Sequence, residues 1–484
     1  MSWRSAPAAQ TGNPTGHRTA RRTGQPTGHP AEPPTGHPAE PPTGRRTGRR
    51  TGHPTGRRQV LVGTVALAAA ALCAACTSSV PASGPAPAVT PAPTSAPSPT
   101  APPEPENPWG PTAAEVALAT ADAAELSDEE VAGQVIVGRL HGTDPATAEQ
   151  LVMDLHLAGV MITGASVASL EQVRSLGAGV QDAVAASGRD WPAIVSTDNE
   201  GGLVQRMSGA VGPWTSFPSF AVAGEVAAAG EPWLVRDAHT AMARELRASG
   251  VTVNWAPVAD VTVPGQDVTI GSRAAGSDPA TVGAAVVPAV RGLLAGGILP
   301  AVKHFPGHGS LTTDSHLALP VHEAGAGHLA ATELPPFAEA VEAGVPMVMV
   351  AHVDVPAWDP GVPASLSPEA YRVLREELEF AGVTVTDSLG MGALAQIGDP
   401  GEVAVAALRA GADLLLNPAD NAVAHAGVVA ALRDGTLERA RVDEAAGRVI
   451  AMMRHQSELA EAAGPPGAVG DGAAAAEALV AAAY

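Results

Sequence analysis

Eight short apolar runs recur along the central part of the chain, and longer alanine-rich stretches separate them. Each run is almost continuously hydrophobic, as expected of parallel strands that are covered on both faces. The stretches between them have the length and composition of helices. The predicted strands are 133–138, 158–164, 192–198, 251–261, 299–305, 345–353, 382–388 and 411–416.

Strands and helices that alternate in this way predict an α/β fold. Eight strands over roughly 350 residues indicate a single (β/α)8 barrel of the TIM type, which we place at 112–460. The alternative is a doubly wound open sheet, but no predicted strand is followed by a glycine-rich phosphate-binding loop. Within the barrel, 368–382 predicts a helix that Gly382 closes. The Gly/Ala-rich residues 461–484 are expected to form a tail or a peripheral helix.

The first 58 residues repeat Pro-Thr-Gly-His and Arg-Arg-Thr-Gly units, and PTGHPAEP occurs in tandem at 26–33 and 34–41. This segment, 1–58, has almost no apolar side chains, so burial cannot offset the entropy that ordering would remove. We expect a disordered basic tail, or a start codon placed upstream of the true one. Residues 77–111 are mainly Pro, Ala, Ser and Thr, which predicts an extended tether.

Residues 59–76 lie between the tail and the tether. The pair Arg57 and Arg58 precedes an apolar run that ends in small residues and Cys76. This pattern is typical of an export signal, and it resembles the signal of bacterial lipoproteins, with Cys76 as the lipidated residue. An ordinary signal peptide, a short membrane anchor and twin-arginine export are the alternatives. Cys73 and Cys76 are the only cysteines, which excludes a disulfide framework for the folded body.

Charge is distributed unevenly between the tail and the body. The first 58 residues contain ten Arg and two Glu and carry +8, and the other 426 carry −29, which gives the formal net charge of −21. An acidic body argues against a nucleic-acid partner. Hydrophobic residues make up 45% of the chain, which is enough for a large core.

Polar side chains stand at or near the carboxyl ends of five predicted strands. Because this end carries the functional groups of a (β/α)8 barrel, these residues are candidates for a site. They are Asp198, Glu200, Asn254, Asp260, Lys303, His304, His352 and Asp387. Of these, Asn254 and Asp260 are expected to satisfy backbone groups, and Glu200 to order its turn.

The segment KHFPGHGSLTTDSH begins at Lys303, the only lysine of the chain, and allows two interpretations. Its histidines and aspartate could be metal ligands, but Pro306 blocks the helix that would aim two of the histidines at one ion. Alternatively, Lys303 and His304 face a polar ligand, and Asp314 accepts the ring N–H of His316 to form a proton-transfer pair. A solvated surface histidine would show the same spacing.

Several stretches of the body match a known pattern, in the same order. They are LSDEEVAGQVIVG, TDNEGGLVQR, VNWAPVADV, GSRAAGSDP, KHFPGHG followed by DSH, MVMVAHV, VTDSLGM and AGADLLL. Together they resemble glycoside hydrolase family 3, in particular its single-barrel bacterial β-N-acetylhexosaminidases, over most of 126–455. KHFPGHG with DSH is the most specific of them. Two positions depart from the family: Asn199 replaces a usual glutamine, and 274–276 lack a usual aromatic residue.

The resemblance implies roles for particular residues. Asp387 stands at the position of the nucleophile, and His316, oriented by Asp314 on a mobile loop, at that of the acid/base. The implied sugar ligands are Asp198, Arg206, Arg273, Lys303 and His304. Structural roles stay open for three residues, because Asp387 could cap the next helix and Arg206 and Arg273 could pair with acids at the rim.

The implied activity is that of an exo-acting, retaining β-N-acetylhexosaminidase that releases terminal N-acetylglucosamine from cell-wall fragments or chitooligosaccharides. It would proceed through a covalent glycosyl-aspartate, without cofactor or metal. We expect a monomer whose partner is its carbohydrate substrate, exported and lipid-anchored on the outer face of the cell membrane, or else secreted. The alternatives are another exoglycosidase of the family, such as a β-glucosidase, and a non-catalytic sugar-binding lipoprotein.

Overall fold

The computed structural model describes residues 109–265 and 269–484. The predicted basic tail 1–58, the signal 59–76 with its Cys76, and the tether up to residue 108 lie outside the described residues. The description below therefore concerns the body of the chain.

Eight parallel strands form one sheet that closes on itself. The strand order is β10-β1-β2-β3-β6-β7-β8-β9, and a parallel bridge between Val385 and Leu414 joins the last strand to the first. The strands are β1 (Ile136–Arg139), β2 (Gly159–Ile162), β3 (Ile194–Thr197), β6 (Val253–Asn254), β7 (Leu299–Phe305), β8 (Met347–Val350), β9 (Val383–Thr386) and β10 (Leu415–Leu416). Each lies within or overlaps a predicted strand, so the (β/α)8 barrel prediction is confirmed and the open sheet is wrong.

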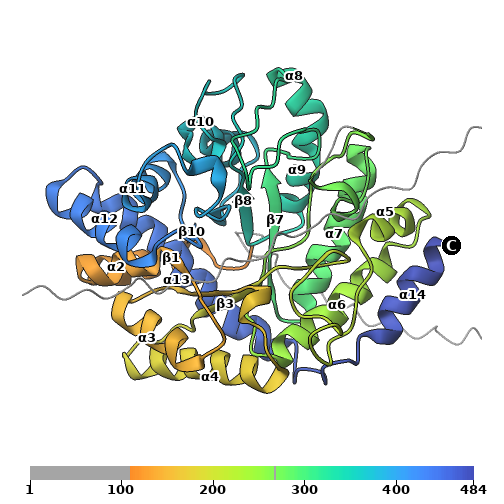
Figure 1. Ribbon diagram of the computed structural model, residues 1–484, viewed down its shortest axis with the longest axis horizontal. Helices are drawn as coiled ribbons and strands as arrows, with labels where there is room; N and C mark the ends of the chain where they lie inside the picture. Colours follow the sequence, from red (N-terminus) through yellow and green to blue (C-terminus); the bar gives the residue numbers. More distant parts are fainter. Residues whose placement is uncertain (1–108, 266–268) are drawn as a thin grey trace, which may run out of the picture. The chain divides into compact units, whose positions relative to one another are not determined.

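Helices surround these strands (Figure 1). They are α1 (Ala113–Ala124), α2 (Asp128–Gln134), α3 (Pro145–Leu155), α4 (Leu170–Ala186), α5 (Phe220–Ala228), α6 (Pro232–Ala248), α7 (Pro279–Ala295), α8 (Ala326–His328), α9 (Pro335–Glu342), α10 (Pro368–Arg372), α11 (Pro400–Ala410), α12 (Asn421–Asp434), α13 (Arg439–Ala462) and α14 (Ala473–Ala483). Among the described residues, no helix combines the length and apolar character needed to cross a membrane.

Local sequence explains where many of these helices begin. Proline opens α3, α6, α7, α9, α10 and α11. It is well suited to this position because the first helical N–H has no partner within the helix. Capping boxes open α1, α2 and α11, each pairing a Thr, Ser or Asp with a Glu three residues later.

The carboxyl-terminal part of the described chain packs onto the barrel. The long helix α13 lies against α1, and α14 packs against α5 and α6 through the buried Ala476 and Leu479. In Figure 1, α14 is the dark blue helix beside α6.

The predicted helix over 368–382 differs from the structure. It begins at Pro368 as expected, but a wider π-helical turn, η5 (Val373–Glu377), follows it and ends at Leu378. The left-handed residue that follows is Glu379, with φ of 52°. The prediction that Gly382 closes this helix is therefore wrong.

An irregularity in β7 affects where its side chains point at the carboxyl end of the barrel. The pairing of β7 with β8 shifts register between Val302 and Phe305. In a regular strand, consecutive side chains point to opposite faces. Here Lys303 and His304 both line the same cavity.

Candidate active site

The carboxyl ends of the strands surround a cavity of about 370 Å³. Side chains from most of the barrel strands and the loops after them form its wall. The polar ones that the argument uses are Arg139, Asp198, Glu200, Arg206, Arg273, Lys303, His304, His316, Asp387, Ser388 and Asn417. All the predicted sugar ligands, the predicted nucleophile and the predicted acid/base histidine therefore meet at one cavity.

A buried ion-pair network forms one side of this cavity. The Lys303 ammonium lies 2.7 Å from Asp198 Oδ1 and 2.6 Å from Glu200 Oε1. Arg273 donates both Nε and Nη2 to Glu200, each at 2.9 Å. Burial raises the pKa of Glu200, but the charges of Lys303 and Arg273 outweigh it and bring the pKa to about 2. Glu200 thus stays ionised and fixes both cations.

The Lys303 ammonium stays charged for the same reason. Its side chain is only 3% exposed, and burial alone lowers its pKa. The adjacent Asp198 and Glu200 carboxylates more than compensate, so the pKa of Lys303 is raised. A charged ammonium whose geometry is fixed in this way can donate a hydrogen bond to a ligand hydroxyl.

Asp260 fixes His304 through the Nδ1 side of its ring and through its backbone N–H. Its Oδ2 lies 2.7 Å from His304 Nδ1, and its Oδ1 accepts the backbone N–H groups of His304 and His308. The outer ring atom, Nε2, is 3.3 Å from Arg273 Nη2. Asp260 thus satisfies backbone groups, as expected, and also fixes the His304 ring, which the sequence did not indicate.

Asp387 stands directly after β9 and lines the same cavity. Burial alone raises the pKa of its carboxyl, but His304, His352, the backbone N–H of Ser388 and Lys303 together lower it. That N–H donates to Asp387 Oδ1 at 2.7 Å. Asp387 does not cap a helix here, because the next helical turn, η6 (Gly392–Leu394), has Met391 at its N-cap. The result is an ionised carboxylate in a cavity.

His316 and Asp314 form a pair at the edge of the cavity. His316 Nδ1 lies 2.9 Å from Asp314 Oδ1, which also accepts the backbone N–H of His316. Burial raises the pKa of Asp314, but the contacts with His316 lower it overall. The imidazole is 63% exposed and lines the cavity, whereas Asp314 is 36% exposed and is not part of the cavity wall. An exposed imidazole with a fixed carboxylate partner can both give and take a proton.

The loop that carries this pair is attached to two other parts of the site. Gly392 N donates to His316 O, and Ala393 N donates to Ser315 O, both at 3.1 Å. The Ser315 hydroxyl lies 3.0 Å from His308 Nε2. The loop that carries the predicted acid/base pair thus contacts the loop that follows Asp387.

The two predicted arginine ligands differ in their surroundings. Arg273 pairs with Glu200, which is the alternative that the sequence left open, and still reaches the cavity. Arg206 also lines the cavity but forms no ion pair with the described residues. Three further cavity residues, Arg139, Ser388 and Asn417, were missed, because each is a single polar residue at or next to the end of an otherwise ordinary predicted strand.

His304 and His308, which the sequence offered as possible metal ligands, each contact another side chain. Within 109–265 and 269–484, no group of three or more His, Cys, Asp or Glu side chains is placed to hold an ion. The His304 ring contacts the Asp260 carboxylate, whereas the His308 ring contacts the Ser315 hydroxyl.

The fold and this site together define a class of enzyme. A (β/α)8 barrel whose catalytic rim combines an ionised carboxylate, an imidazole–carboxylate pair and a polar cavity has the groups that a glycoside hydrolase needs for displacement at a sugar carbon.

Comparison with known proteins gives the family. Residues 126–452 match the family described as "Glycosyl hydrolase family 3 N terminal domain". A β-hexosaminidase, LpqI, of Mycobacterium tuberculosis is 34% identical over 335 residues, which is 68% of this chain and 83% of the relative. The chain belongs to glycosyl hydrolase family 3.

Solved structures agree with this assignment. A family 3 β-N-acetylglucosaminidase from a Paenibacillus species is 32% identical with a TM-score of 0.67, over 73% of this chain and 68% of that one. A β-N-acetylhexosaminidase from Beutenbergia cavernae is 30% identical with a TM-score of 0.62, over 68% of this chain and 98% of that one.

Proposed function

We propose that this protein is an exo-acting, retaining β-N-acetylhexosaminidase that removes terminal N-acetylglucosamine from carbohydrates. The observation that carries the proposal is the meeting of Asp387 and the His316–Asp314 pair at one cavity. The names of the relatives, β-hexosaminidase and β-N-acetylglucosaminidase, support N-acetylglucosamine as the sugar. This protein is a glycoside hydrolase of the same type.

The first chemical step forms a covalent intermediate. An Asp387 carboxylate oxygen attacks the anomeric carbon of the sugar, and the bond from that carbon to the leaving oxygen breaks. His316 in its imidazolium form gives its proton to the leaving oxygen, and Asp314 stabilises the imidazolium. The lowered pKa of Asp387 keeps the nucleophile ionised while this occurs.

The second step restores the enzyme. Neutral His316 takes a proton from water, and the water oxygen attacks the anomeric carbon while its bond to Asp387 breaks. Two inversions give net retention. Most retaining glycosidases use a second carboxylic acid for proton transfer, and here the His316–Asp314 pair takes that place.

The ion-pair network favours binding of a single terminal sugar. Lys303, Asp198 and Arg273 are fixed by their mutual contacts and present charged donors and acceptors at the cavity wall. Such groups select sugar hydroxyls by hydrogen bonding. We propose cell-wall fragments or chitooligosaccharides as the source of this sugar.

The proposed location rests on the predicted export signal, residues 59–76. Export and lipidation at Cys76 would place the enzyme on the outer face of the cell membrane, with secretion as the alternative. The expected result is that Cys76→Ser moves the protein from the membrane fraction to the medium. Size-exclusion chromatography with light scattering tests the proposed monomer.

The test of the activity compares two nitrophenyl substrates and two variants. We expect release of nitrophenol from the N-acetyl-β-glucosaminide and not from the β-glucoside, which separates this activity from that of a β-glucosidase. Asp387→Ala should lower kcat by on the order of 10⁴-fold or more. Release from neither substrate would favour a non-catalytic sugar-binding protein.

His316→Ala separates proton transfer from the rest of the mechanism. We expect kcat on a natural disaccharide to fall by roughly 10² to 10⁴-fold, and less on the nitrophenyl substrate, whose leaving group needs little protonation. Unchanged activity on the disaccharide would show that the assignment of the pair is wrong.

A further inference from the structure

The buried carboxylate of Glu245, in α6, is not part of the cavity wall, and the mechanism above does not use it. It accepts three hydrogen bonds from neutral donors. Oε2 accepts the backbone N–H of Thr215 at 2.9 Å, and Oε1 accepts the Thr215 hydroxyl at 2.5 Å. Oε1 also accepts the backbone N–H of Gly472, at the start of α14, at 2.7 Å. Glu245 thus joins the loop 206–219 to α14.

The loop that Glu245 holds is bound in turn to a short hairpin, residues 199–205. Gln205 donates Nε2 to Thr215 O at 2.5 Å and accepts the backbone N–H of Phe217 at 2.9 Å. The Phe217 carbonyl accepts the backbone N–H of Gly202, at the turn of the hairpin, at 2.9 Å. The loop therefore supports the hairpin both at its second strand and at its turn.

This hairpin carries ligands of the proposed sugar site. Asp198 precedes it, Glu200 lies within it and Arg206 follows it, and all three line the cavity. Glu200 also contacts Lys303 and Arg273. A displacement of the hairpin would therefore move the sugar-binding wall, whereas the proposed nucleophile and acid/base come from other elements.

The helix α14 packs directly against the residues that hold the hairpin, on the side where it lies beside α6 (Figure 1). Its Leu479 lines a small cavity of about 10 Å³ together with Glu200 and Phe217. At the start of the helix there is no room for a side chain. A Cβ at Gly472 would lie 2.7 Å from Glu245 Oε1 and 2.7 Å from Phe217 Cζ. The position of α14 is therefore coupled to that of the hairpin.

We propose that Glu245 and α14 position the hairpin 199–205, so that the contact between them sets how tightly the terminal sugar is bound. Glu245 is a positioning residue, because it acts through Thr215 and Gln205 and not on the sugar itself. This inference rests on the proposed function, since it assumes that the sugar binds at this cavity. It predicts weaker sugar binding on disruption of the contact, with little change in the chemical step.

The experiment changes the contact from both sides in the whole protein, with 4-nitrophenyl N-acetyl-β-glucosaminide as the substrate. Glu245→Gln keeps the shape of the side chain, but an amide has only one acceptor oxygen, so its NH2 group faces the N–H of Thr215 or that of Gly472. Gly472→Ala places a methyl group against Glu245 and Phe217.

For each variant we expect KM and the inhibition constant of the product, N-acetylglucosamine, to rise about tenfold, while kcat changes by less than about threefold. Neither constant depends on how much of the variant is folded. If the two changes act through one contact, the KM of the double variant should match that of the weaker-binding single variant.

Two control variants separate positioning from stability. Gly467→Ala lies on the same segment, but its added Cβ meets no atom closer than 3.6 Å, and it should leave KM unchanged. Asp413→Asn removes the charge of a buried carboxylate that three arginines contact outside the cavity, and it should also leave KM unchanged.

An unchanged KM in both Glu245→Gln and Gly472→Ala, or a fall in kcat alone, would overturn the proposal. A double variant whose KM rises by the product of the two single effects would also overturn it, because the two changes would then act independently. If the unaltered protein releases no nitrophenol, the proposed function fails, and this inference fails with it.

Discussion

At the scale of single residues, Lys303 shows how strongly one position can be constrained. The chain uses arginine for every other fixed positive side chain, yet keeps lysine here. The ammonium is buried between two carboxylates at 2.6 and 2.7 Å. A compact ammonium with rotatable donors fits that space, whereas a planar guanidinium is larger and has fixed donor directions.

We therefore expect Lys303→Arg to impair the enzyme although the charge is kept. The larger guanidinium would displace the Asp198 or Glu200 carboxylate, and the bound sugar would shift with it. A shift of the substrate by about 1 Å can lower the rate roughly 100-fold. The measurement is kcat/KM on the nitrophenyl N-acetyl-β-glucosaminide. The matched control is the exposed Arg236→Lys, which should retain activity. Near-normal activity of Lys303→Arg would show that Lys303 acts only as a charge.

At the scale of elements, the apolar pattern predicted all eight barrel strands, because a strand buried on both faces needs a continuous hydrophobic run. The hairpin of β4 (Asn199–Gly201) and β5 (Val204–Gln205) was not predicted. It is short and polar, and Gly201 and Gly202 turn it with positive φ. Its fold depends on tertiary contacts, such as that of Asn199 with Asn254.

The site was predicted unevenly for a similar reason. Residues that share a strand end or a short loop, such as Lys303 with His304 or Asp314 with His316, could be found from the sequence. The ring of His304 is held by Asp260, 44 residues away, and Glu200 holds Arg273 from 73 residues away. Spacing along the chain carries no information on such pairs. They become visible only when the barrel brings the strands together.

The contact between the acid/base loop and η6 gives a prediction at this scale. A Cβ at Gly392 would lie 2.5 Å from His316 O and 3.0 Å from Leu317 O, both backbone atoms. We expect Gly392→Ala to push the loop outward and lower kcat on a disaccharide by about tenfold or more. Nitrophenyl glycosides, which need less proton donation, should be affected less.

The control is Gly327→Ala in α8, where an added Cβ meets nothing within 4 Å. It should behave like the unaltered enzyme on both substrates. A similar loss on both substrates with Gly392→Ala would mean that the change disturbs Asp387 and not the loop.

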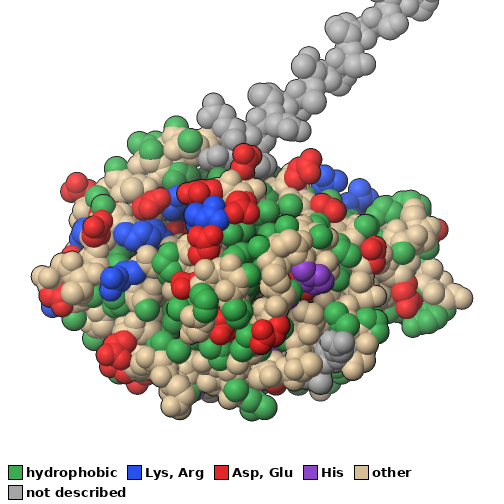
Figure 2. Space-filling view, turned by 90° about the horizontal axis from the view of Figure 1, so that it is seen from above, with side chains coloured by type: hydrophobic (Ala, Val, Ile, Leu, Met, Phe, Trp, Pro, Cys, Tyr) green, Lys and Arg blue, Asp and Glu red, His purple; other side chains and the backbone are tan. Residues whose placement is uncertain are grey.

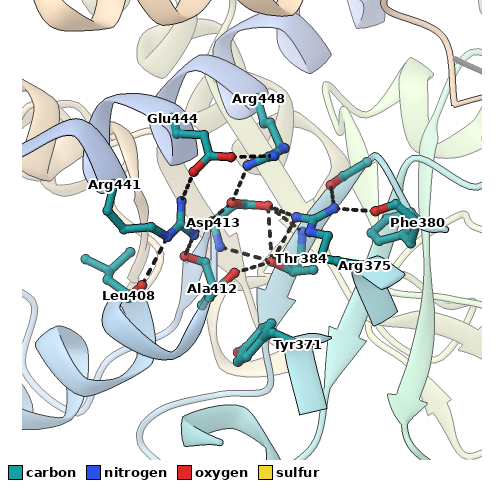
Figure 3. Close-up of polar contacts among 12 residues, drawn as sticks. Tyr371, Arg375, Phe380, Thr384, Leu408, Ala412, Asp413, Arg441, Glu444 and Arg448 are labelled. Carbon is teal, nitrogen blue, oxygen red and sulfur yellow. Dashed lines mark hydrogen bonds and ion pairs between the residues drawn. The ribbon is translucent and has the colours of Figure 1, made fainter. Parts of the chain in front are cut away.

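At the scale of the whole molecule, buried charges lie at both ends of the barrel. Those at one end line the active-site cavity, and those at the other end connect elements of the fold. On the face shown in Figure 2, acidic side chains are scattered and no broad basic patch is seen, in keeping with the net charge of −21. The end opposite the active site holds another buried carboxylate, that of Asp413, which precedes β10. Arg375, Arg441 and Arg448 surround it (Figure 3).

The Asp413 cluster connects elements that are far apart in the sequence. Asp413 is fully buried and also accepts the backbone N–H and the hydroxyl of Thr384, in β9. Two of its arginines come from α13 and the third from η5. Polar networks at this end of a (β/α)8 barrel serve stability and not catalysis. The cluster thus links α13 and η5 to the amino-terminal ends of β9 and β10.

Asp413→Asn should therefore destabilise the fold and leave catalysis intact. Removing one partner of a buried ion pair costs about 3–5 kcal/mol. The change would leave Arg375 without an ion-pair partner among the described residues, and Arg441 and Arg448 with Glu444 alone. Burial raises the pKa of Asp413, but the three arginines and Thr384 bring it to about 2 in the folded state. In the unfolded chain it is about 3.9. The stabilisation is complete above pH of about 4 and is lost as the pH falls toward about 2.

Urea unfolding of the two proteins between pH 7 and pH 3 measures this difference. We expect the gap in the free energy of unfolding to be widest near neutral pH and to narrow below pH of about 4, while kcat at pH 7 stays the same for the folded variant. The control is Asp237→Asn, which removes an exposed pair with Arg236 and should change stability by less than about 1 kcal/mol. A gap that does not depend on pH would mean that packing around Asp413, and not its charge, holds this end of the barrel together.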